Sequence, residues 1–347
     1  MTSTENITAY FTHPSFVEHD LEGHVEHAGR IRRVWQALAE HNLLTELRAC
    51  EPEPASTELI LEVHSREHLD LLKEAEALGE TVLIDADTYF TPGSLEVAKL
   101  AAGAVAGAVA EVISGRANNA LAAVRPPGHH ATRDGAMGFC LLNNVAIAAR
   151  LAQLEYGLKR VMIVDFDVHH GNGTQDIFYR DDSVLFVSLH QQGIYPLSGD
   201  LSETGAGMGR GFTVNLPLEA GCGDETCLEL VDEILWPLAR RFAPELVLVS
   251  AGFDAHWRDP LASLNLSLTG MAELARKLIA QAGELCGGRI VFAMEGGYDL
   301  EVLGHGVANL AALLCGKGEV TDPLGPGMPQ ARKIGPLLHA LRQAHGL

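Results

Sequence analysis

Short apolar runs recur along the chain, and most are separated by longer stretches with the periodicity of amphipathic helices. The run Val161–Val164 has β-branched residues at both ends and no polar alternation, which is typical of a strand buried on both faces. Similar runs lie on either side of it in the sequence. The predicted strands are Ile7–Phe11, Ala120–Val124, Val161–Val164, Val184–Leu189, Leu246–Ser250 and Arg289–Met294.

Helical patterns fill much of the chain between these runs. Ser94 is the predicted N-cap of a long Ala-rich helix that continues from Val97 to about Ile113. The polar segment Leu83–Pro92 is predicted as a loop, and the Gly-rich segment Gly193–Gly211 as a longer, functional one. The other predicted helices are Ile31–Leu47, Glu67–Leu78, Asn143–Leu154, most of Asp224–Arg241 and a short one at the end of Gly316–Leu347.

The alternation of strands and helices predicts an α/β fold, with a central, mainly parallel β-sheet flanked by helices on both faces. We find no internal repeat and no clear linker in the sequence. We therefore predict a single domain over residues 1–347, with residues 316–347 forming a C-terminal tail that packs on it.

Glycine and polar residues follow strand after strand. The segments are RPPGHHA at Arg125–Ala131, DFDVHHGNGT at Asp165–Thr174, AGFD at Ala251–Asp254 and EGGY at Glu295–Tyr298. In open α/β sheets, ligands bind at the carboxyl ends of the strands. We therefore predict that these segments meet at one edge of the sheet and form an active site there.

One of these segments carries a dense group of ionisable side chains. Asp165, Asp167, His169 and His170 follow directly after a buried strand, where they are costly to desolvate unless something pairs with them. Asp167 and His169 offer a carboxylate oxygen and an imidazole nitrogen, and Asp254 can add a third ligand from its own strand end. Such a set with an open position forms a hydrolytic zinc site, which we predict here. The alternative is a strand end with solvated charges.

Two histidines and a tyrosine are the candidates for proton chemistry. His129 and His130 lie on a turn constrained by Pro-Pro-Gly and point in different directions, so they suit an acid/base pair. They could instead be two surface histidines. Tyr298 follows two glycines and has a hydroxyl to donate at the same edge, although a tyrosine there could also pack as core. Gly138 lies in an apolar segment whose backbone could approach a ligand.

The charge of the chain limits its partners. A formal net charge of −20 over 347 residues repels DNA and anionic membranes and favours cationic ligands, although solubility alone also explains it. Six scattered cysteines without a C-x-x-C pair indicate a reducing compartment. We see neither a signal-peptide pattern nor an apolar run that could span a membrane. We expect a cytoplasmic protein that binds neither nucleic acid nor membrane and that could form homo-oligomers.

Together the motifs resemble the zinc-dependent histone deacetylase superfamily, which also contains acetylpolyamine amidohydrolases. The resemblance extends from about Phe11 to Cys315 and depends on RPPGHH, GFC-x-x-NN, DxDVHHGNGT, SAGFDAH and EGGY, which occur in the family's order. Tyr298 and Asn172 make the chain similar to the class II branch and its bacterial relatives. The resemblance implies the arginase–deacetylase fold.

The resemblance also implies roles for the site residues. It assigns Asp167, His169 and Asp254 to one catalytic zinc, in agreement with the ligand argument above. It pairs Asp165 with His129 and Asn172 with His130 as the acid/base machinery, and Tyr298 with the substrate carbonyl. It implies that Gly138, Phe139 and Tyr195 line a narrow channel for an acyl-lysine-type substrate, with Asp87 holding the substrate backbone at the rim.

Members of the family also bind structural potassium. The positions that match the first ion are Asp165, Asp167, His169, Ser188 and Leu189. The positions that match the second ion are Phe178, Asp181, Val184 and Phe212.

Two positions depart from the family's pattern. His24-Val25-Glu26 stands where many members have His-Pro-Glu, in a region that shapes the rim of the channel. Leu261 stands where polyamine-specific members can carry an acidic residue, which argues against selection of a polyamine by a carboxylate at this place.

We therefore predict a zinc-dependent amidohydrolase that removes acetyl or other short acyl groups from acylated amines. Within the family, the substrate could be an acyl-lysine, an acetylpolyamine or another small amide. An arginase-like ureohydrolase would need a second metal and more carboxylates. A non-catalytic acyl-lysine reader would be expected to lack a ligand, a histidine or the tyrosine, and none of these is missing from the sequence.

Overall fold

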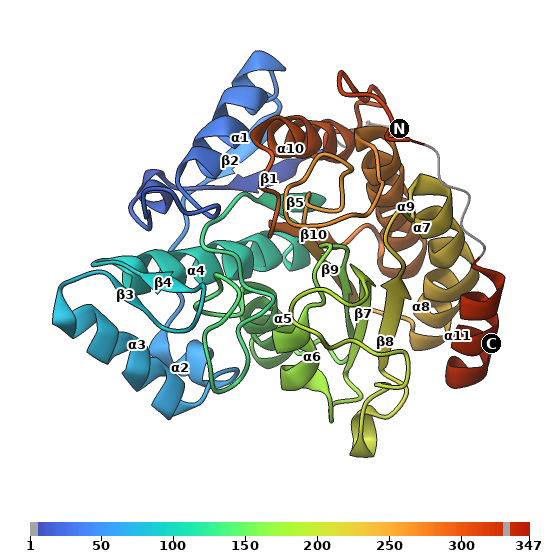
Figure 1. Cartoon of the computed structure of the whole chain (residues 1–347), viewed down its shortest axis with the longest axis horizontal. Coiled ribbons are helices and arrows are strands. Elements are labelled where there is room, and N and C mark those ends of the chain that lie inside the picture. The colour runs from blue at the N-terminus through green and yellow to red at the C-terminus, as the bar shows by residue number, and fades with distance from the viewer. Residues whose placement is uncertain (1–5, 329–333) are drawn as a thin grey trace.

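The computed structural model describes residues 6–328 and 334–347. Within them, eight parallel strands form one sheet in the order β2-β1-β5-β10-β9-β6-β7-β8 (Figure 1). The strands are β1 (Thr8–Phe11), β2 (Leu47–Cys50), β5 (Asn119–Ala122), β6 (Val161–Asp165), β7 (Val184–Gln191), β8 (Thr213–Leu218), β9 (Leu246–Ala251) and β10 (Ile290–Met294). The predicted parallel sheet is confirmed, and every predicted strand is present.

Helices cover both faces of this sheet, as predicted (Figure 1). On one face lie α4 (Ser94–Ile113), α5 (Asn144–Leu154) and α6 (Asn172–Phe178), with α2 (Thr57–Leu61) and α3 (Arg66–Leu78) packed outside them. On the other face, α1 (Gly29–Glu40) packs against α10 (Leu300–Leu314), and α10 packs against α9 (Leu268–Cys286). The elements α7 (Asp224–Leu230), the π-helical turn η3 (Val231–Leu235) and α8 (Trp236–Phe242) extend this layer.

The tail lies against the body of the protein. Helix α11 (Gly335–His345) packs on η3, while the predicted domain also includes residues 1–5 and 329–333, which lie outside the described residues. The remaining short elements are the 3-10 turns η1 (Pro14–Val17) and η2 (Gly207–Gly209) and the antiparallel pair β3 (Val82–Leu83) and β4 (Tyr89–Phe90). In the described part of the chain, no helix combines the length and apolarity needed to cross a bilayer.

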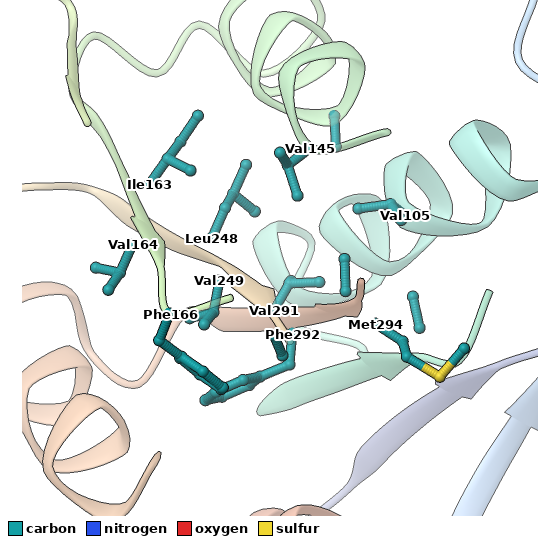
Figure 2. Close-up of a cluster of buried hydrophobic side chains, with 14 of the residues drawn as sticks. Val105, Val145, Ile163, Val164, Phe166, Leu248, Val249, Val291, Phe292 and Met294 are labelled. Carbon is teal, nitrogen blue, oxygen red and sulfur yellow. The ribbon is translucent and has the colours of Figure 1, made fainter. Parts of the chain in front are cut away.

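The core is built from alternate faces of the central strands. Ile163 of β6 and Leu248 of β9 lie on the side of Val145 of α5, whereas Phe166 and Phe292 lie on the opposite side of the sheet (Figure 2). Because both faces of the sheet are buried, the sequences of these strands are continuous apolar runs without alternating polar residues.

Three predictions of local structure were wrong in detail. Helix α1 ends at Glu40 and not at Leu47, because Asn42 adopts a positive φ of 53° and turns the chain into β2. The predicted loop Leu83–Pro92 contains strand β4. Ser94 is the first residue of α4 and not its N-cap, and its hydroxyl accepts a hydrogen bond from the Thr91 N–H.

A fully buried ionic network ties the N-terminal segment to the edge of the sheet where the strands end. The Glu26 carboxylate accepts hydrogen bonds from Arg125 Nε at 2.5 Å and Nη2 at 2.6 Å, and from Arg30 Nη1 at 2.9 Å. Arg30 also donates to the carbonyls of Glu295 and Gly297. Burial would raise the pKa of Glu26, but the two guanidinium groups hold it well below its usual value.

We expect Glu26→Gln to lower the free energy of unfolding by about 3–5 kcal/mol at pH 7, because it leaves two buried arginines without their counter-charge. Since the pKa is depressed in the folded state, this stabilisation is complete above about pH 4.5 and decreases as the pH falls below it. Urea unfolding at pH 7 and at pH 4 measures both effects. The matched control is Glu301→Gln, whose half-exposed ion pair with Arg33 is worth about 1 kcal/mol or less.

Candidate active site

The four polar segments meet because of the strand order. Strands β5, β10, β9 and β6 are neighbours in the sheet and all run in the same direction. The segments that follow them therefore emerge at one edge, although they lie far apart in the sequence. This is the arrangement predicted for a site at the carboxyl ends of the strands.

Asp167, His169 and Asp254 form a buried cluster whose ligand atoms lie within 4.8 Å of one another. Nδ1 of His169 is 3.2 Å from Oδ1 of Asp167 and 3.2 Å from Oδ2 of Asp254. The outer oxygens are held by backbone, because Asp254 Oδ1 accepts from the Val168 N–H and Asp167 Oδ2 from the Gly296 N–H. Asp254 Oδ2 is buried and makes no hydrogen bond.

This cluster fits a divalent cation. Burial raises the pKa of Asp254, and the adjacent Asp167 carboxylate adds to this effect, so a positive charge between the two would be stabilising. Burial would lower the pKa of His169, but the same two carboxylates raise it to about 10, which shows how strongly the cluster attracts positive charge. Two carboxylate oxygens and one imidazole nitrogen are ligands typical of a catalytic zinc site.

Glycine allows the backbone to enclose these carboxylates. A Cβ atom on Gly296 would lie 2.1 Å from Asp254 Oδ2 and 2.5 Å from Asp167 Oδ2, and one on Gly252 would lie 2.1 Å from Asp167 Oδ2. Any side chain at either glycine would therefore displace the candidate ligands.

The adjacent histidines have different surroundings. His129 Nδ1 donates to Asp165 Oδ2 at 2.9 Å, and although burial would lower its pKa, Asp165 and Asp167 raise it to about 10. His130 Nδ1 donates to Asn172 Oδ1 at 2.7 Å. Burial and then the nearby His129 and His169 lower the pKa of His130 well below its usual value. The carboxylates therefore favour the cationic form of His129, whereas the surroundings of His130 favour its neutral form, in which Nε2 is the basic nitrogen.

Tyr298 is the remaining candidate for proton chemistry. It follows Gly297, which has a φ of 124°, and its ring lies under the Arg30 guanidinium at 4.9 Å from the ring centroid. Burial raises the pKa of the Tyr298 phenol well above its usual value, so the hydroxyl keeps its proton. The phenol can therefore donate a hydrogen bond at any physiological pH.

One cavity of about 210 Å³ brings the predicted catalytic and substrate-binding side chains together. Phe139 stands edge-on to Tyr298, and Tyr195 edge-on to His130. His130 lines this cavity and His129 does not, which separates two residues that the sequence could not distinguish. The lining residues are Asp87, His130, Gly138, Phe139, His169, Tyr195, Leu261 and Tyr298.

Close packing explains Gly138 in this wall. It has a φ of 56°, and a Cβ atom there would lie 2.4 Å from the ring of His130. A larger cavity of about 470 Å³ lies between the Gly193–Gly211 segment and α11, and it contains none of the predicted catalytic side chains.

The residues assigned to potassium lie in two places. Asp165 pairs with Ser188 across β6 and β7, and Leu189 follows in β7. The second group lies at the opposite ends of the strands, where Val184 begins β7, Phe212 precedes β8, and the Asp181 N–H donates to the Phe178 carbonyl at 3.0 Å. Both potassium sites stay predictions.

Sequence reasoning gave no role to Glu295, and it placed His24 at the rim without identifying its partners. Glu295 accepts hydrogen bonds from the N–H groups of Gly128 and His129 and from the Ser250 hydroxyl, and so fixes the turn that carries both histidines. His24, in the departure from His-Pro-Glu, bonds the Asp87 carbonyl and packs edge-on to Phe139 at the rim. The signal for Glu295 was present, since it is an acidic residue directly after a buried strand, like Asp165.

The fold and this site together define a class, the amide hydrolases built on the arginase–deacetylase fold. Comparison with known proteins narrows the class to one family. The Histone deacetylase domain profile matches residues 24–314, and the chain belongs to this family.

Its relatives come from several kingdoms. The chain is 40% identical to "Histone deacetylase 10, chloroplastic" of rice (Oryza sativa subsp. japonica), over 97% of this chain and 81% of the relative. It is 41% identical to a probable deacetylase of Archaeoglobus fulgidus (85% and 82%) and 39% identical to the histone deacetylase-like amidohydrolase of Pseudomonas aeruginosa (87% and 80%).

A solved structure confirms the fold. The crystal structure of the HDA15 HD domain superposes on 99% of this chain and 95% of its own with a TM-score of 0.88 and 32% identity. The arginase–deacetylase fold is therefore confirmed, and as a family member the protein is a deacetylase-type amidohydrolase.

We expect the wild-type protein to bind one zinc ion per chain and Asp254→Ala to lose at least about 100-fold in zinc affinity, because one of three ligands is removed. Equilibrium dialysis followed by elemental analysis measures this without any assay of turnover. Asp322→Ala is the control, since that carboxylate bonds the Thr269 N–H outside the cluster. Full zinc occupancy in Asp254→Ala would refute the ligand assignment.

Proposed function

We propose that the protein is a zinc-dependent amidohydrolase that removes acetyl or other short acyl groups from acyl-lysine-type amines. The observation that carries the proposal is the cavity whose lining brings His130, His169 and Tyr298 together with Phe139, Tyr195 and Leu261. A cavity lined by aromatic and aliphatic side chains and a few polar groups suits an alkyl chain that ends in an amide.

The metal would be held by Asp167, His169 and Asp254. A bound zinc ion supplies Lewis-acid polarisation of the amide carbonyl and increases the acidity of the attacking water. The protein's own side chains carry out the other steps, and the geometry of each side chain supports one role.

His130 is the general base. It is neutral, and because its Nδ1–H is held by Asn172, the lone pair on Nε2 can accept the proton of the attacking water. The same nitrogen can then return that proton to the leaving amine. His129, fixed by Asp165 and adjacent to His130, would in its cationic form stabilise negative charge that develops in the site.

Tyr298 stabilises the oxyanion. Its protonated hydroxyl can donate to the former carbonyl oxygen as charge develops there, and the two aromatic side chains Phe139 and Tyr195 exclude water around the bond that breaks. The products are a short carboxylic acid and a free amine.

Two rival functions receive less support. A ureohydrolase of the same fold would need two metals about 3.5–4 Å apart, and residues 6–328 and 334–347 contain one cluster of candidate ligands. A non-catalytic reader of acyl-lysine would not need a neutral histidine, a protonated phenol and an open metal site in one cavity.

A substrate panel tests the proposal. Purified zinc-loaded protein should release acid from an acetyl-lysine peptide faster than from an N-acetylated polyamine or a simple acetamide. Leu261 offers no carboxylate at its position to select a second ammonium group, and we assign Asp87, the carboxylate that does line the cavity, to the substrate backbone. Hydroxamates should inhibit, since they chelate zinc at an open position. Fully zinc-loaded protein that releases acid from none of the three would contradict the proposal, and preference for the polyamine would redirect it to that substrate.

Tyr298→Phe should lower kcat and kcat/KM together by roughly 10²–10³, because it removes a donor that acts on the transition state. Zinc content and the free energy of unfolding should stay close to wild type, since the ring is retained. Steady-state kinetics on the best substrate of the panel measures both constants. A raised KM with unchanged kcat would mean that the hydroxyl contributes only to substrate binding.

A further inference from the structure

The position of Tyr298 is not fixed by its own segment. It follows Gly296 and Gly297, and glycine leaves the backbone free to adopt many conformations. Bonds from other segments must therefore place the tyrosine. On the carbonyl side, Arg30 donates to Glu295 and Gly297 and lies over the Tyr298 ring.

On the amide side, the corresponding bonds come from Asp259. This residue is 5% exposed and lies in the segment after β9. Its Oδ2 accepts from the Tyr298 N–H at 2.7 Å and from the Asp299 N–H at 3.3 Å. Its Oδ1 accepts from the Leu261 N–H at 3.0 Å. One carboxylate thus connects the segment after β9 to the segment after β10.

Both connections end on residues that line the cavity. Leu261 forms part of its wall, and Tyr298 supplies the hydroxyl at its catalytic end. We propose that Asp259 is a positioning residue, whose carboxylate holds the Tyr298 hydroxyl in register with the substrate carbonyl. This inference rests on the proposed function of Tyr298.

Asp259 contributes a bond that nothing nearby can replace. The adjacent ion pair between Arg258 and Asp299, at 3.0 Å, ties the same two segments together but reaches neither the Tyr298 amide nor the Leu261 amide. Loss of one acceptor oxygen of Asp259 should therefore loosen the tyrosine while the segments stay joined.

The variant that tests the inference is Asp259→Asn, which keeps the size of the side chain and replaces one acceptor oxygen with an NH₂ group. We expect kcat to fall by roughly 10–100-fold with zinc content unchanged, because a displacement of about 1 Å is enough to cost two orders of magnitude in rate. Glu245→Gln is the matched control. Glu245 Oε2 likewise accepts from two consecutive N–H groups, those of Lys159 and Arg160, at the opposite end of the strands. This control should retain wild-type kcat.

A double-mutant cycle separates positioning from a general structural role. If Asp259 acts through the Tyr298 hydroxyl, Asp259→Asn should change kcat by less than about threefold when introduced into Tyr298→Phe. Rate losses that multiply in the double variant would overturn the inference, as would an Asp259→Asn enzyme with wild-type kcat.

Amide hydrogen exchange gives a test that needs no activity. In the wild type, the amides of Tyr298 and Asp299 should exchange at least about tenfold more slowly than an unprotected amide, and Asp259→Asn should remove this protection. If Asp259→Asn does not fold, the wild-type measurement still decides, since rapid exchange at Tyr298 would refute the bond. An inactive wild type with a protected Tyr298 amide would contradict the proposed function and leave the Asp259 bond intact.

Discussion

Buried negative charge is the constraint on which this structure depends. Asp165, Asp167, Asp254 and Glu295 are all 0% exposed at the ends of neighbouring strands, and each unpaired carboxylate there would cost several kcal/mol. The protein compensates with groups that also serve the chemistry. His129 pairs with Asp165, backbone N–H groups bond the outer oxygens of the cluster, and Glu295 holds the turn that carries the histidines. Both the stability of this edge of the sheet and the proposed catalysis therefore require positive charge and N–H groups close to the buried carboxylates.

Much of this could be predicted from the sequence, because the physics is local. A fully buried parallel strand needs a continuous apolar run, so β6, β7, β9 and β10 can be recognised in the sequence. Polar residues directly after such runs are therefore candidates for an active site. That Asp167, His169 and Asp254 lie together follows from the rule that parallel strands end on one edge. Gly138 was predicted to let the backbone approach a ligand, and in the structure a Cβ atom there would meet the His130 ring.

The rest could not be predicted, because it depends on partners that are distant in the sequence. Strands β2 and β8 lie at the two edges of the sheet and lack continuous apolar runs, and Pro217 in β8 is tolerated only because that strand has a single neighbour. Nothing local marks Glu26 as the counter-charge of Arg125, 99 residues away. The opposite pKa shifts of His129 and His130 depend on the groups around each ring, and the partners Asp165 and Asn172 reach the two rings only in the folded chain.

The bonds of Arg30 also determine when the site can form during protein synthesis. Its guanidinium bonds the carbonyls of Glu295 and Gly297, which follow it by 265 and 267 residues. Contacts over such sequence separations form late, because a long loop must close first. Asp167 and His169 leave the ribosome well before Asp254 and Tyr298, so a nascent chain carries two candidate ligands without the third and without the phenol. The amide hydrolysis that we propose thus requires a chain that has been translated past Tyr298 and has folded.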